Sequence, residues 1–142
     1  MLILRPEQLE AFKPLADAQF ADRVAAYLRR KHARAVVRLV NGPTLVERLS
    51  DETLMNMVQL GIERARSYDL TWESSITTFV ALMFKVAPNF DRHHLITSAL
   101  HDTRFAADER LQKMWEHITS NNWEEARNNY DASAWQLKPE ER

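Results

Sequence analysis

Residues 50–87 read SDETLMNMVQLGIERARSYDLTWESSITTFVALMFKVA, and this stretch decides the fold. Ser50 is a preferred N-cap residue, and the two acidic residues after it suit the positive end of a helix. The apolar side chains that follow recur at helical spacing, which predicts one buried face. This face comprises Leu54, Val58, Gly61, Ile62 and Ala65. Gly61 is unusual inside a helix, so we expect a neighbouring helix to approach it too closely for a side chain.

The second half of the stretch predicts that neighbouring helix. Tyr68 and Asp69 end the first helix, with Asp69 as the left-handed residue that closes it. Thr71 is expected to cap the second helix, and Pro88 stops it. The inner face of this helix comprises Trp72, Ile76, Phe79, Val80, Met83 and Ala87. Two packed amphipathic helices therefore form the predicted centre of the fold.

The sequence on the N-terminal side predicts a long helix and an ambiguous segment. Residues 15–32 carry an apolar stripe at helical spacing, made of Phe20, Val24, Tyr27 and Leu28. Pro6 suits a first helical position, and Pro14 either kinks this helix or splits it from a short first turn. Residues 33–50 are either a helix end or a short buried extended segment, interrupted at 41–43 by Asn-Gly-Pro.

The sequence on the C-terminal side predicts shorter helices. We expect one over residues 93–101, another that starts near Asp108, and a last one from Trp123 to Tyr130 after a break at Asn121-Asn122. The inner face of the middle helix comprises Leu111, Met114, Trp115 and Ile118. We expect Trp72 and Trp115 to be core residues because both fall on apolar stripes.

Composition agrees with a helical fold. The chain of 142 residues holds only two glycines, whereas hairpin turns usually depend on glycine. We therefore predict an all-α fold, a compact bundle of about five to seven helices with a long N-terminal helix. Residues 1–135 are expected to form a single helical domain, and residues 136–142 a frayed tail.

The sequence also bears on location and charge. It contains no cysteine and no apolar run of signal-peptide or membrane-spanning length, so we expect a cytoplasmic protein without a membrane span. The net charge is −1, but residues 1–50 carry nine basic and five acidic residues, and residues 51–142 carry ten and fifteen. Two surfaces of opposite sign, or pairing between the halves, would account for this difference.

No catalytic, metal or cofactor motif is apparent. The histidines of the 91–102 segment invite a metal interpretation, but His94 and His101 would lie about 10.5 Å apart along a helix. Zinc ligands lie about 2 Å from their ion, so these two cannot share one. Ser74 and Ser75 lack a nucleophile elbow and suit a first helical turn. We predict a protein that is not an enzyme and has no cofactor and no metal.

Three segments are candidates for contact with a partner protein. The first is the basic run 29–34, which also suits a helix C-terminus; the chain is not basic overall, so we predict no nucleic-acid partner. The second is the loop at 86–95. The third runs from 123 to 135, where tryptophans either contact a partner or fold the segment back onto the body. The candidate partner-binding residues are Arg29, Arg30, Arg34, Arg92, His93, Trp123 and Trp135.

Several short segments between residues 3 and 118 together form a sequence pattern. They read LRPEQLEAF at 4–12, GIERARSY at 61–68, FVALMF at 79–84, NFD at 89–91 and DERL at 108–111. This pattern resembles a family of small helical proteins encoded in bacterial type VI secretion loci, beside the spike, tip and effector genes. The chain departs from the family at Asp69, where the family usually has glycine.

The resemblance implies no enzyme activity. It implies a co-chaperone or adaptor that assists effector loading, with an effector, an effector chaperone or a spike component as partner. Small proteins of such loci can instead be immunity proteins that bind and neutralise a cognate toxin, so this alternative stays open.

Overall fold

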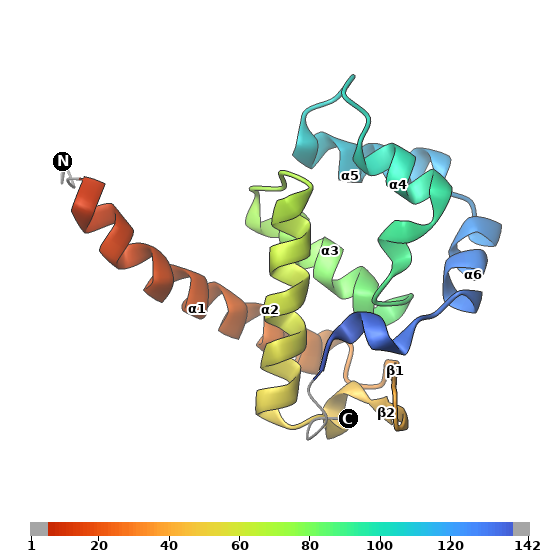
Figure 1. The fold of residues 1–142 in the computed structure, drawn as a ribbon, viewed down its shortest axis with the longest axis horizontal. Coiled ribbons are helices and arrows are strands. Elements are labelled where there is room, and N and C mark those ends of the chain that lie inside the picture. Colours follow the sequence, from red (N-terminus) through yellow and green to blue (C-terminus); the bar gives the residue numbers. More distant parts are fainter. Residues whose placement is uncertain (1–5, 138–142) are drawn as a thin grey trace.

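The computed structural model describes residues 6–137, and it describes side chains from Asp17 onward. Within that range the prediction of an all-α bundle with a long N-terminal helix is confirmed (Figure 1), with one small hairpin added to it. The helices are α1 (Pro6–Lys31), α2 (Asp51–Ser67), α3 (Glu73–Lys85), α4 (His94–Leu100), α5 (Ala107–His117) and α6 (Ser120–Asn128). The strands are β1 (Val36–Leu39) and β2 (Gly42–Leu45), and the 3-10 turns are η1 (Val46–Arg48), η2 (Phe90–Arg92) and η3 (Ala132–Trp135).

Helix α1 starts at Pro6 as predicted and continues through Pro14, so this proline does not split it. Its N-terminal half extends away from the other elements, whereas its C-terminal half passes behind α2 (Figure 1). Phe20, Val24 and Leu28 are buried there, which confirms the predicted stripe.

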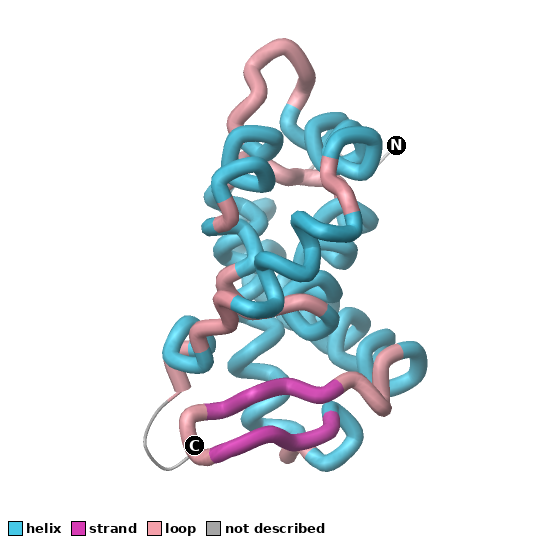
Figure 2. Tube along the Cα trace, turned by 90° about the vertical axis from the view of Figure 1, so that its right-hand side faces the viewer, coloured by secondary structure: helices cyan, strands magenta, loops and turns pink. Residues whose placement is uncertain are grey.

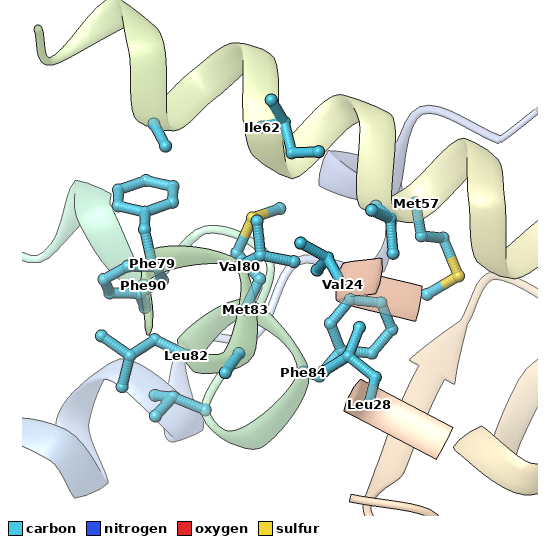
Figure 3. Close-up of a cluster of buried hydrophobic side chains, with 14 of the residues drawn as sticks. Val24, Leu28, Met57, Ile62, Phe79, Val80, Leu82, Met83, Phe84 and Phe90 are labelled. Carbon is cyan, nitrogen blue, oxygen red and sulfur yellow. The ribbon is translucent and has the colours of Figure 1, made fainter. Parts of the chain in front are cut away.

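The pair α2 and α3 forms the centre of the core, as the stretch 50–87 predicts. The Ser50 hydroxyl accepts the Thr53 N–H at 3.1 Å, and Asp69 closes α2 with a φ of 66°. A Cβ added to Gly61 would lie 3.0 Å from Val80 Cγ2 and 3.1 Å from Met83 Sδ, which confirms the predicted close approach. Side chains of α1, α2, α3 and η2 meet in one apolar cluster (Figure 3).

The ambiguous segment 33–50 contains the extended alternative, not a helix end, but it is not buried throughout, since Val36 and Val40 are exposed. Strands β1 and β2 pair antiparallel, with Val36 opposite Leu45 and Leu39 opposite Gly42, at one end of the molecule (Figure 2). Gly42 has a φ of 130°, a conformation that favours glycine. Val37 is buried and attaches the hairpin to the body.

Two predicted helix starts are wrong. Helix α3 begins at Glu73 with Trp72 in the N-cap position, and no side chain caps it there. Asn122 does not break the chain but lies inside α6, because it forms a capping box with Thr119: its Oδ1 accepts the Thr119 N–H at 2.9 Å, and the Thr119 hydroxyl accepts the Asn122 N–H at 3.2 Å.

The prediction that Trp72 and Trp115 are core residues is also wrong, since they are 50% and 51% exposed. Trp72 precedes its helix, so helical periodicity does not place it. Trp115 lies beside the inner face of α5, and its ring packs 5.4 Å from that of Trp123. At the other end of the described chain Leu137 is buried; residues 138–142 of the predicted tail lie outside the described range.

Candidate functional site

The arginines of the predicted basic run have different surroundings: Arg29 is bonded to the body of the protein, whereas Arg30 and Arg34 are exposed. Arg29 donates to the Leu49 carbonyl oxygen at 2.8 Å and pairs with Asp51 at 2.9 Å, so it attaches the end of α1 to the start of α2. Arg30 and Arg34 are exposed, and neither side chain forms a hydrogen bond or ion pair with a group that the structure describes. These two side chains are therefore available for contact with a partner, whereas Arg29 already has intramolecular partners.

The two C-terminal tryptophans also differ in burial: Trp135 is buried, and Trp123 is half-buried. Trp135 is 2% exposed, its ring lies 4.9 Å from that of Phe84, and its Nε1 donates to the Tyr130 hydroxyl at 3.0 Å. It folds the C-terminal segment back onto the body, which is the second of the two alternatives that the sequence left open for it. Trp123 is half-buried between Phe90 and Trp115.

Arg92 and His93 lie between α3 and α4 in the chain. Arg92 is exposed and pairs with Asp131 at 3.3 Å. The His93 ring is only 5% exposed; its Nδ1 accepts the Leu95 N–H at 3.2 Å and caps α4. Since Nδ1 accepts, a neutral ring carries its proton on Nε2, which lies 3.6 Å from Glu125 Oε1 without a hydrogen bond among the described groups.

A small polar cavity of about 330 Å³ adjoins this histidine. It is lined by Asn89, Arg92, His93, His94, Glu125, Ala126 and Asn129. The pKa of Glu125 is lowered, first by the amide of Asn122 and then by the two histidines. In the described part of the chain, no three His, Cys, Asp or Glu side chains are grouped so that they would hold a metal ion.

A buried ionic network holds the segment before α4. Asp91 accepts from the Arg64 guanidinium through one carboxylate oxygen and from the Tyr68 hydroxyl, at 2.6 Å, through the other. Arg64 also donates to the Pro88 carbonyl oxygen at 2.5 Å. Burial, and then the bond to Asp91, raises the pKa of Tyr68. Because Thr97 donates to the Asp91 carbonyl oxygen, the network connects α2, η2 and α4.

A second buried carboxylate fixes α5 against α3. Asp108 accepts the Trp72 N–H at 2.9 Å and both the N–H and the hydroxyl of Thr71, at 3.1 and 3.0 Å. Burial opposes the charge on Asp108, but the hydrogen bonds from Trp72 and Thr71 outweigh it and lower the pKa of this carboxyl. The role that the sequence suggested for Thr71, a helix cap, is therefore replaced by an anchor between two helices.

A cleft of about 620 Å³ lies between α4 and α5. The helices lie side by side and are joined by the turn at 101–106 (Figure 1). We call this the α4–α5 cleft; it is lined by Leu95, Ser98, Ala99, His101, Asp102, Thr103, Arg104, Phe105, Arg110, Lys113, His117 and Ile118. Leu95 is 41% exposed, so the cleft presents apolar surface to solvent.

The charge of the α4–α5 cleft is predominantly positive. The Asp102 carboxylate is paired with Arg104, which donates to it from Nε at 3.0 Å and from a terminal nitrogen at 2.8 Å. These hydrogen bonds lower the pKa of Asp102 to about 2. Arg110 and Lys113 lie on the α5 wall of the cleft and supply further positive charge. Arg110 Nε donates to the Phe105 carbonyl oxygen at 2.9 Å. The cleft is thus a cationic site in the acidic part of the chain.

The sequence did not predict a partner-binding role for any individual residue of this cleft; it pointed only to His101, as a rejected metal ligand, to Ile118, as a core position, and to Leu95, as the last residue of the candidate loop at 86–95. The available signal was a basic stripe at positions 110, 113 and 117 of α5, spaced for one flank of a helix. Such a stripe is typical of any solvated helix, so it does not indicate a cleft until the position of α4 is known.

Comparison of the chain with known proteins identifies no relative. No protein-family model, no curated protein and no solved structure matches the chain. No helix in residues 6–137 has the length and apolar character needed to cross a bilayer.

Proposed function

We propose that the protein is a non-enzymatic interaction protein, a cytoplasmic adaptor or co-chaperone that assists effector loading in a type VI secretion system. The resemblance of the segments between residues 3 and 118 supports the secretion system. The observation that carries the binding role is the α4–α5 cleft, an apolar floor beside a cationic wall.

The surface composition of the cleft suits contact with a protein. Arginine and aromatic residues are enriched at protein interfaces, and exposed apolar side chains next to charged ones are typical of a binding patch. Leu95, Phe105 and Arg110 supply these three types within one concave site. The anchors at Asp91 and Asp108 hold the cleft walls in place, which limits the ordering cost of binding.

A pull-down from cells that carry the native operon tests this function. The tagged full-length chain, expressed at its native level, should retain an effector, an effector chaperone or a spike component, identified by mass spectrometry. Recovery of no protein of the locus would contradict the adaptor role.

An immunity role is the second candidate, and the charge distribution favours it. The chain carries a basic excess before residue 51 and an acidic excess after it, and charge of both signs suits fast, tight capture of a toxin. Co-expression with the toxin encoded beside it should then restore growth. Continued toxicity at equal expression would eliminate this role and leave the adaptor role intact.

A further inference from the structure

The shape of the α4–α5 cleft limits what can enter it. The α4 wall that faces the cleft presents small side chains at Ser98 and Ala99, which leave room for a bulky group. From Leu95 to Ala99 this wall extends about 6 Å at helical rise, which matches about one turn of a second helix.

Backbone pairing in the cleft is excluded by its walls. The lining comes from two helices and the turn that joins them, and none of these elements is a strand, so no strand edge is available for an extended peptide. A helix, in contrast, needs only side-chain pockets at intervals of three or four residues. The cleft therefore suits a helical occupant.

The apolar floor of the cleft specifies one face of that occupant. Leu95 is exposed, Phe105 is half-buried between α4 and α5, and Ile118 closes the floor. An apolar side chain placed among them would remove exposed apolar area from water, at about 25 cal/mol per Å².

The cationic wall specifies the other face. The Lys113 ammonium lies 5.4 Å from the Phe105 ring and 3.6 Å from Glu116, an exposed i,i+3 pair that contributes little and leaves the charge available. Arg110 uses Nε for the Phe105 carbonyl oxygen, and its terminal nitrogens have no hydrogen bond to any described residue. Carboxylates on an incoming helix would form charge-assisted hydrogen bonds with both Arg110 and Lys113.

We propose that the α4–α5 cleft holds an acidic amphipathic helix of a partner protein, with an apolar anchor between Leu95 and Phe105 and carboxylates against Arg110 and Lys113. This rests on the proposed binding function and adds the chemistry of the partner. A nucleic acid fits less well, because Glu109 and Glu116 are exposed on the same helix as the cations and would repel a long phosphate backbone.

The first test measures binding of a labelled peptide to the full chain by fluorescence anisotropy. The probe is a helical peptide with leucines at i, i+3, i+4 and i+7 and glutamates beside them; its twin has lysine in place of each glutamate. The glutamate peptide should bind, and its affinity should fall as salt shortens the screening length from about 10 Å to about 3 Å. Equal binding of both peptides would overturn the proposal, as would competition by a single-stranded oligonucleotide that binds more tightly.

Paired variants locate the site. Lys113→Glu should weaken binding about tenfold, whereas Arg127→Glu reverses a comparable i,i+3 pair on α6 and should change it less than about twofold. Ser98→Trp fills the cleft at no cost in helix propensity and should abolish binding. Gln112→Trp, at an exposed α5 position outside the cleft lining, should leave it intact.

The two proposals fail separately. If Ser98→Trp binds the peptide as well as wild type, with unchanged circular dichroism, the cleft assignment is overturned. If the pull-down then still retains a protein of the secretion locus, the adaptor role stands. If the peptide binds as expected and the pull-down retains none, the adaptor role fails and the cleft assignment stands.

Discussion

Replacing Asp91 with alanine should destabilise the protein by about 3 kcal/mol. Its side chain is 5% exposed and is paired with Arg64, which is 19% exposed. Removing one partner of a buried ion pair typically costs about 3–5 kcal/mol, because the remaining charge loses its counter-ion. We take the lower end because Arg64 keeps its bond to the Pro88 carbonyl oxygen and reaches solvent in part.

Two further variants divide this effect among the members of the network. Asp91→Asn keeps the size and an acceptor for the Tyr68 hydroxyl but loses the charge, so about 2 kcal/mol is expected. Tyr68→Phe removes one bond to a charged acceptor and should cost about 1–2 kcal/mol. As a control, Asp17→Ala breaks an exposed pair with Arg66 and should cost less than about 1 kcal/mol.

Urea unfolding followed by circular dichroism measures these differences. With a slope of about 2 kcal/mol per molar, Asp91→Ala should lower the midpoint by about 1.5 M. A loss of less than about 0.5 kcal/mol, or one equal to that of Asp17→Ala, would show that the network does not hold the segment before α4.

Three other predictions follow from the core and its anchors. Gly61→Ala should cost about 1 kcal/mol in wild type through contact with Val80, but should become stabilising in a Val80→Ala background, where helix propensity prevails; a double-mutant cycle in urea measures both. Because the pKa of Asp108 is lowered in the fold, wild type should lose stability as the pH falls from about 5 to 3, and the deficit of Asp108→Asn measured at pH 7 should shrink in that range. Trp135→Ala should cost about 3–5 kcal/mol in urea unfolding, whereas Arg30→Ala, at an exposed position, should stay within about 0.5 kcal/mol.

The helical frame was predictable because its signals are local. Ser50, Gly61 and Asp69 each have a backbone or contact requirement that few other residues meet, and all three lie where the sequence places them. Trp115 shows the limit of such patterns: a position beside an apolar stripe is buried or exposed according to the neighbouring helix, which periodicity does not identify.

The candidate site was predictable only in part, because it depends on contacts between distant segments. His93 was selected for its neighbours in sequence, yet its cavity forms only when α6 brings Glu125 beside it. The α4–α5 cleft likewise requires the turn at 101–106 to set two helices side by side. Asp108 illustrates the same limit, since its partners Thr71 and Trp72 lie more than thirty residues earlier.

The most direct test of the account is partner capture by wild type and by Ser98→Trp from cells with the native operon, quantified by mass spectrometry. The account predicts that wild type and Gln112→Trp retain an effector, effector chaperone or spike component, and that Ser98→Trp loses it. Capture of no such protein by wild type, or equal capture by Ser98→Trp, would contradict an adaptor that binds its partner in the α4–α5 cleft.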